Sequence, residues 1–160
     1  MTAADPDGWA PGEDLPELAR RVQQVFEEIH REVFAGDPVA NPRLRVEVRD
    51  AVTVADTLTL VLLTPWTING LIFPPDDALP ASLRVGGRDL PVFAHELDDV
   101  GPYRSVNLVS QPTTCRDQEH ARELVAPLAA AFREAVARAR EAEEVVDPGR
   151  RRFLTGGGGT

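Results

Sequence analysis

The first residues that could carry chemistry are a histidine and nearby carboxylates in the second half of the chain. His95 and Glu96 are followed by Asp98 and Asp99, so one imidazole and three carboxylates stand within five residues. Such groups can bind a divalent metal ion. On a strand, however, His95 would point away from Glu96, and a turn rich in aspartate is usually just solvated. We predict no metal site and no cofactor, and keep a metal-handling role for His95, Glu96 and Asp98 as an alternative.

The single cysteine, Cys115, is the candidate for nucleophilic catalysis. If a helix begins near Arg116, its N-terminus would lower the pKa of the thiol, and His120 follows little more than one turn later. These two residues supply neither an orienting third group nor an oxyanion hole, and cysteine is often a small buried residue. We predict no enzyme and no catalytic residue; a Cys115-centred enzyme is the second alternative. One cysteine also excludes an internal disulfide and a thiolate-rich metal site.

Large apolar side chains gather beside prolines in the middle of the chain. Thr64-Pro65-Trp66 is followed by Asn69 and by Leu71-Ile72-Phe73-Pro74. Trp66 either closes the core or forms an apolar platform for a partner, because tryptophan often anchors interfaces. The sequence leaves both open, since burial cannot be read from residue type.

Two helices frame the segments that carry these residues. Apolar residues recur at steps of three and four from residue 16 onward, and Gly36 with Pro38 ends that run. A second periodic stretch predicts a helix from about residue 116 to residue 146, with Thr114 as its N-cap and Asp117 at the third position. Pro127 predicts a kink or a break near residues 123–127.

Between the helices the apolar period changes to two, which predicts strands. The continuous apolar run at residues 60–63 predicts a strand covered on both faces, at the centre of the sheet. Asn69-Gly70 indicates either a hairpin or a bent strand, whereas Gly86-Gly87 predicts a two-residue hairpin. The predicted strands cover residues 44–48, 57–64, 66–73, 83–85, the segment from 88, 92–97 and 104–110.

The order of elements predicts one α+β domain over residues 16–146. We expect a mainly antiparallel sheet of about five or six strands, with the N-terminal and C-terminal helices packed on one face. Residues 1–15 have turn formers without a periodic apolar face, and we expect a mobile arm there. Residues 147–160 form a basic, glycine-rich tail.

Composition limits the functional classes. The chain has 160 residues and a formal net charge of -9, which repels phosphate backbones and argues against nucleic-acid binding. No stretch approaches the roughly 18 apolar residues of a membrane span. The acidic start has no apolar core of a secretory signal, so we expect a cytoplasmic protein.

Four ordered motifs resemble the HybE/HupJ-type NiFe-hydrogenase assembly chaperones. Thr64-Pro65-Trp66-x-x-Asn69 resembles the family signature T-P-W-x-x-N, and Glu96-Leu97-Asp98 with Tyr103 is similar to its E-[IL]-D-x(4)-Y stretch. Asp117-Gln118-Glu119-x-Ala121-Arg122 resembles the start of its C-terminal helix, and residues 149–156 resemble its closing R-R-x-F-L-x-G. The resemblance covers about residues 17 to 156.

The resemblance implies a non-enzymatic maturation factor without a cofactor. Its partners would be immature hydrogenase subunits: the small-subunit precursor, with its twin-arginine signal peptide, and possibly the large subunit. Such a chaperone would delay export until cofactors are inserted, and it would act as a monomer or a homodimer. We expect Trp66, Asn69 and Phe73 to contact the client, Glu96 and Asp98 to pair with arginines, and Tyr103 to orient the acidic turn.

The tail carries a further hypothesis. Arg150, Arg151, Phe153 and Leu154 match the core R-R-x-F-L of twin-arginine signals, but glycines follow them in place of an apolar stretch. The tail would therefore mimic a signal peptide and fill the cargo groove of its own chain or of a neighbour. The alternative is an arginine-rich tail whose apolar pair docks on the body.

Overall fold

The computed structural model describes residues 15–73 and 79–146. The predicted arm, except for Leu15, and the tail with Arg150, Arg151, Phe153 and Leu154 lie outside the described residues. The helices are α1 (Leu15–Ile29), a π-helical turn η1 (His30–Phe34) and α2 (Gln118–Val146). The strands are β1 (Glu47–Val54), β2 (Thr57–Leu63), β3 (Ile68–Phe73), β4 (Ser82–Val85), β5 (Arg88–Pro91), β6 (Phe93–Leu97) and β7 (Gly101–Val109).

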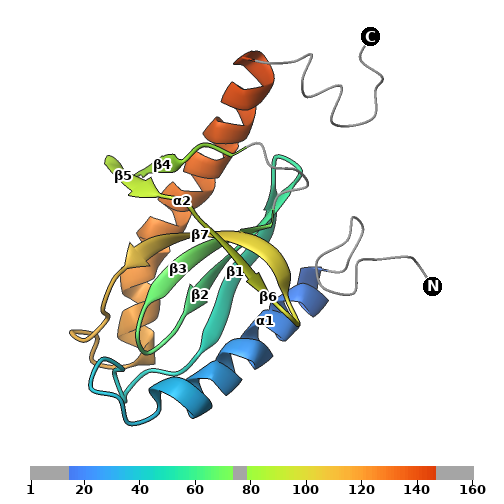
Figure 1. Cartoon of the computed structure of the whole chain (residues 1–160). Helices are drawn as coiled ribbons and strands as arrows, with labels where there is room; N and C mark the ends of the chain where they lie inside the picture. The colour runs from blue at the N-terminus through green and yellow to red at the C-terminus, as the bar shows by residue number, and fades with distance from the viewer. Residues whose placement is uncertain (1–14, 74–78, 147–160) are drawn as a thin grey trace.

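Five strands form one antiparallel sheet in the order β1-β2-β3-β7-β6, and β4 and β5 form a separate hairpin (Figure 1). The predicted α+β class and antiparallel pairing are confirmed. β2 is buried along its whole length, as its apolar run predicted. It is not the central strand, however, because β7 comes back to pair with the free edge of β3. The centre of the sheet is therefore β3.

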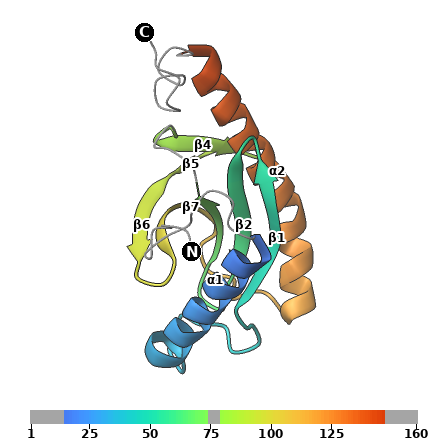
Figure 2. The same ribbon diagram turned by 90° about the vertical axis from the view of Figure 1, so that its right-hand side faces the viewer.

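The two helices lie on opposite faces of the sheet, so the prediction of one covered face is wrong (Figure 2). Side chains alternate along β2: Leu60 and Leu62 join the cluster packed against α1, whereas Val61 and Leu63 join the cluster packed against α2. A continuous apolar run means that both faces of a strand are buried. Each face therefore needs its own covering helix.

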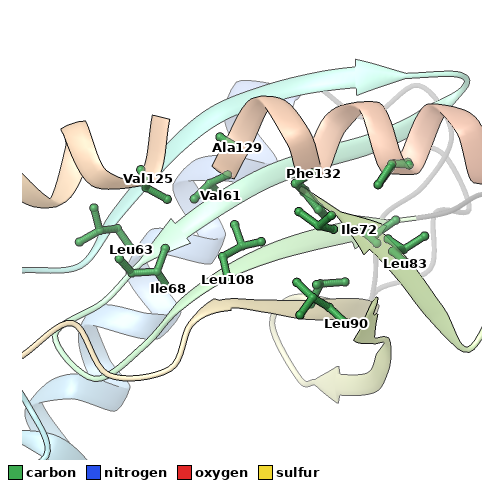
Figure 3. Close-up of a cluster of buried hydrophobic side chains, with 14 of the residues drawn as sticks. Val61, Leu63, Ile68, Ile72, Leu83, Leu90, Leu108, Val125, Ala129 and Phe132 are labelled. Atoms are coloured by element: carbon green, nitrogen blue, oxygen red, sulfur yellow. The ribbon is translucent and has the colours of Figure 1, made fainter. Parts of the chain in front are cut away.

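The face that packs against α2 forms the larger apolar cluster (Figure 3). Phe132 of α2 is fully buried and lies directly over Gly70 of β3. An added Cβ at Gly70 would stand 2.6 Å from the ring of Phe132. Glycine at this position thus lets the helix approach the sheet, and it explains why Asn69-Gly70 continues a strand and makes no hairpin.

The other predicted turns formed. Gly86 and Gly87 have φ values of 57° and 84°, as a two-residue hairpin between β4 and β5 requires. β6 and β7 form the predicted hairpin, although β7 begins earlier, at Gly101.

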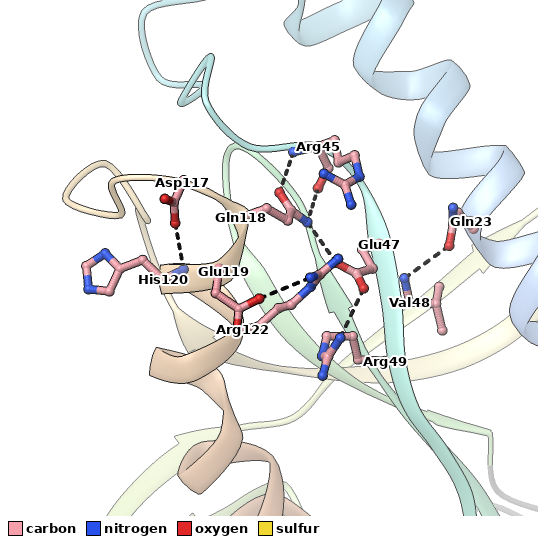
Figure 4. Close-up of polar contacts among 10 residues, drawn as sticks. All are labelled: Gln23, Arg45, Glu47, Val48, Arg49, Asp117, Gln118, Glu119, His120 and Arg122. Carbon is pink, nitrogen blue, oxygen red and sulfur yellow. Dashed lines mark hydrogen bonds and ion pairs between the residues drawn. The ribbon is translucent and has the colours of Figure 1, made fainter.

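β1 begins later than predicted, at Glu47, because a side chain takes the place of a neighbouring strand before it (Figure 4). The N–H of Arg45 donates to Oε1 of Gln118 at 2.9 Å, and Nε2 of Gln118 donates to the carbonyl of Arg45 at 3.2 Å. Gln118 and Arg122 also donate to the carboxylate of Glu47, at 2.9 and 3.0 Å. This network fixes the start of α2 on the edge of β1.

The start of α2 differs from the prediction in its cap. Asp117, and not Thr114, accepts the N–H of His120 at 2.8 Å and caps the helix. We predicted a kink or a break near Pro127; α2 continues through this residue, so the helix is not broken there. Pro127 lies on the exposed side of α2, where water can satisfy the carbonyl that loses its donor. Neither helix in the described part of the chain is long and apolar enough to span a membrane.

Candidate functional site

The surface is hollowed between α1 and the turn that joins β6 to β7, which lie beside each other in Figure 1. This hollow, which we call the α1 groove, has a volume of about 550 Å³. That volume is within the range of roughly 300–1,000 Å³ found for ligand sites. Its lining comprises Arg21, Gln24, Val25, Glu28, Ile29, Glu32, Leu97, Asp98 and Asp99.

Helical spacing explains which side chains of α1 line the groove. Val25 and Ile29 are four residues apart and half-buried, so together they form one apolar strip. Glu28 and Glu32 have the same spacing and lie exposed beside that strip. The stripe formed by Leu18 and Val22 faces the sheet instead and is fully buried. The apolar side of α1 is therefore wider than its contact with the sheet, and the surplus forms the floor of the groove.

The opposite wall is a rigid turn. The N–H of Val100 donates to the carbonyl of Leu97 at 3.1 Å, and the side chain of Val100 is completely buried. Gly101 follows with a φ of 89°, a conformation that favours glycine, and returns the chain into β7. Asp98 and Asp99 therefore occupy the two corner positions of an anchored turn, with exposed side chains.

The groove combines an apolar floor with a negative rim. Val25, Ile29 and Leu97 supply the floor, and four carboxylates face one arginine, Arg21, around it. Glu28 has a distant ion pair, 3.9 Å from Arg31, with both side chains exposed. Such a pair contributes little, so the carboxylate of Glu28 stays open to a better partner. This arrangement suits a segment that carries arginines next to apolar side chains.

Of the predicted partner-binding residues, Asp98 lines the groove. Two others belong to the apolar cluster on which α1 packs. Phe73 and Tyr103 are buried in the cluster beneath α1, with ring centroids 5.7 Å apart. Burial raises the pKa of Tyr103 to about 12, so the phenol stays protonated at neutral pH. On its other side Tyr103 stacks on His95 at 5.0 Å. Tyr103 thus packs against two rings, and its role in orienting the acidic turn stays a prediction.

Trp66 lies apart from the groove. Its ring is half-buried and stacks on Phe34 of η1, with centroids 4.1 Å apart and planes inclined by 10°. His30 lies on the same ring at a centroid distance of 5.8 Å. Trp66 is therefore neither sealed in the core nor a free platform; it anchors the π-helical end of α1. Contact with a partner at this ring stays a prediction.

The string around Trp66 builds the connection between β2 and β3. Thr64 is fully buried, and its hydroxyl donates to the carbonyl of Thr67 at 2.6 Å. The same hydroxyl accepts the N–H groups of Trp66 and Thr67 at 3.3 and 2.9 Å. Asn69 accepts a hydrogen bond from Asn107 of β7 at 2.9 Å. Threonine and asparagine in this motif therefore hold the turn and the pair β3–β7.

The alternative metal set does not assemble. His95 pairs with Tyr103 and Glu96 with Pro102, so the strand register places His95 and Glu96 on opposite faces of the sheet. Nε2 of His95 lies 2.7 Å from the hydroxyl of Ser105. Across residues 15–73 and 79–146, no three histidine, cysteine, aspartate or glutamate side chains come together as a metal site. Glu96 is exposed and outside the groove.

The alternative thiol site also lacks its geometry. Cys115 is buried, and burial raises the pKa of its thiol, although the charge of Arg116 opposes the shift. Nδ1 of His120 accepts the N–H of Arg116 at 3.0 Å and is turned to the backbone. Asn41 donates to the carbonyl of Cys115 at 2.9 Å. Cys115 is therefore part of the packed connection before α2.

Sequence reasoning missed the half of the groove that comes from α1. The signal was present: Val25 and Ile29 widen the apolar side of the helix, and Glu28 and Glu32 flank them at the same spacing. Reading the helix only for its core stripe assigned these apolar residues to the interior. The apolar side of this helix is wider than one contact with the sheet requires, and this extra width could have predicted a second surface.

The fold and the groove together define an α+β domain with an acidic, partly apolar recess. Residues 17–156 match the family described as NiFe-hydrogenase assembly, chaperone, HybE, and the chain belongs to this family.

The chain is also similar to a known protein in sequence and to a solved structure in fold. The chain is 33% identical over 98 residues to the hydrogenase-2 operon protein HybE of Escherichia coli O157:H7. The aligned part makes up 56% of this chain and 60% of that protein, less than two thirds of its length. The solution structure of HybE from Escherichia coli is similar with a TM-score of 0.56 and 22% identity, covering 83% of this chain and 82% of that one. This structural likeness supports the fold.

Proposed function

We propose that this protein binds immature NiFe-hydrogenase subunits in the cytoplasm and catalyses no reaction of its own. Its main client is the precursor of the small subunit, whose twin-arginine signal peptide lies in the α1 groove. While the groove is occupied, the precursor is held back from export until its cofactors are inserted. The large subunit is a second client. The membership of the chain in a family of hydrogenase assembly chaperones supports this proposal.

The observation that carries the proposal is the composition of the α1 groove. A twin-arginine signal presents two neighbouring guanidinium groups followed by apolar side chains. Asp98 and Asp99 from the turn, with Glu28 and Glu32 from α1, offer carboxylates on both sides of the recess. Arginine binds carboxylates through two parallel hydrogen bonds, and the apolar residues of the signal can cover the floor.

Binding of a synthetic signal peptide tests this assignment directly. The peptide is that of the hydrogenase small-subunit precursor encoded in the same genome, and its affinity is measured by calorimetry. Two groove variants each lose two carboxylates: Asp98→Asn with Asp99→Asn, and Glu28→Gln with Glu32→Gln. Exposed ion pairs contribute about 0.2–1 kcal/mol each, so each double variant should raise Kd about two- to thirtyfold. Added salt should shrink that difference.

A matched control removes the same charge from the other face of the sheet. Glu123→Gln with Glu134→Gln changes two exposed carboxylates of α2 and should leave Kd close to that of the unmodified chain. A peptide with glutamines in place of both arginines should bind weakly to every chain. Equal losses in the groove and control variants would mean that only net charge matters, and the groove would not be the site.

A further inference from the structure

We propose that the α1 groove also receives the C-terminal segment of a second copy of this chain, so that tail and client compete for one recess. The proposal depends on the proposed function only in the identity of the competing client. The occupant is the segment of residues 147–160, which lies outside the described residues and whose amino-acid sequence sets its chemistry.

The chemistry of the tail complements that of the groove. Arg150, Arg151 and Arg152 stand together, and Phe153 and Leu154 follow directly. The groove offers four carboxylates around a floor of three half-buried apolar side chains. The tail has three arginines and one aspartate in a chain whose net charge is -9. This basic segment therefore matches an acidic recess.

The position of α2 argues for exchange between two copies. α2 ends at Val146, beyond the sheet, whereas α1 and the β6–β7 turn lie toward the other end of the molecule and across the sheet from α2 (Figures 1 and 2). A helix of 29 residues is about 43 Å long. The four residues from Val146 to Arg150 span at most about 14 Å when fully extended. Because α2 carries the chain away from the groove before the tail begins, we assign the tail to the groove of a neighbouring molecule.

The oligomeric state of the full chain is the first measurement. Sedimentation over a range of concentrations should show a monomer–dimer equilibrium. Deleting residues 147–160 should weaken dimerisation about tenfold or more, as should Asp98→Asn with Asp99→Asn. The length-preserving variant Arg150→Gln, Arg151→Gln, Arg152→Gln should behave like the deletion. Glu123→Gln with Glu134→Gln should dimerise like the unmodified chain.

Complementation distinguishes exchange from any other dimer. The tail-deleted chain keeps an intact groove, and the Asp98→Asn, Asp99→Asn chain keeps an intact tail. An equimolar mixture should form a heterodimer while each chain alone stays largely monomeric. A full chain that stays monomeric throughout, a dimer unaffected by tail deletion, or a mixture without heterodimer would overturn the proposal.

A peptide assay separates this proposal from the client assignment. A synthetic peptide of residues 147–160 should bind the tail-deleted chain, and the Asp98→Asn, Asp99→Asn changes should weaken it about tenfold. If the client signal peptide binds that chain and the tail peptide does not, tail exchange is wrong while the proposed function holds. If only the tail peptide binds, the client assignment fails and the exchange remains.

Discussion

Substituting Gly70 by alanine tests how α2 is seated on the sheet. The added Cβ would stand 2.6, 2.6 and 2.7 Å from Cε1, Cζ and Cε2 of Phe132. Carbon atoms in contact prefer about 3.5–4.0 Å, so the ring or the strand must move by about 1 Å. Phe132 is fully buried, which leaves no open space for that movement.

The magnitude follows from two opposing effects. Overpacking a core typically costs about 1–3 kcal/mol. Gly70 does not lie in the left-handed region, so alanine there would otherwise stabilise the strand by about 0.5–1 kcal/mol. We expect Gly70→Ala to lower the free energy of unfolding by about 1–2 kcal/mol and Tm by about 2–8 °C. The sign of the change is therefore diagnostic, because alanine should stabilise the protein if no ring covers Gly70.

Urea unfolding and thermal melting of four chains provide the assay. Phe132→Leu removes the three ring atoms that meet the new Cβ, at the expense of some packing. In this background Gly70→Ala should become neutral or stabilising, giving a favourable coupling energy of about 0.5–3 kcal/mol between the two sites. A stabilised Gly70→Ala single variant, or additive effects in the double variant, would refute the described contact between α2 and β3.

Three further predictions concern the connections and the titrating groups. Thr64→Val should destabilise the fold by about 1–3 kcal/mol because two N–H groups lose their acceptor, whereas Thr64→Ser should retain most of the stability in the same urea titration. Burial opposes ionisation of Glu47, but hydrogen bonds from Gln118 and Arg122 prevail and lower its pKa. Its stabilising contribution is therefore present above the ordinary glutamate pKa of about 4.3 and is lost as pH falls through the lowered value. Glu47→Gln should differ from the unmodified chain in unfolding free energy at about pH 7, and the difference should shrink as pH falls through the lowered pKa. Cys115 should resist a thiol reagent in the native protein and react on unfolding, since it is buried with a raised pKa; rapid native labelling would contradict this.

Local patterns predicted most of the fold because their causes are local. Gly86-Gly87 supplies the positive φ values that its hairpin needs. The placement of α1 depended on a longer argument. The apolar run at residues 60–63 already required cover on both faces, and only two helices were available, so one had to lie on each side.

The site was harder to predict because it joins segments distant in the sequence. Asp98 was identified from its turn, but its counterparts Glu28 and Glu32 come from α1, and no local pattern says which turn a helix will face. Glu96 looked equivalent to Asp98, yet alternation along β6 puts it outside the groove. Of the three carboxylates in this acidic stretch, Asp98 and Asp99 thus line the groove, whereas Glu96 is a solvent-exposed side chain outside it.

The family signature and the groove have different tasks in this structure. In the Thr64-Pro65-Trp66-x-x-Asn69 string, Thr64 holds the β2–β3 turn, Trp66 anchors η1 and Asn69 ties β3 to β7. η1 directly continues α1, so the ring contact of Trp66 with Phe34 helps to fix the helix that supplies one wall of the groove. The signature can therefore influence client binding without touching the client. Trp66→Leu should then weaken binding of the signal peptide and also loosen the C-terminal end of α1. Amide hydrogen exchange over residues 26–34 would detect the loosening. Weaker binding with unchanged protection there would instead place Trp66 in direct contact with the client.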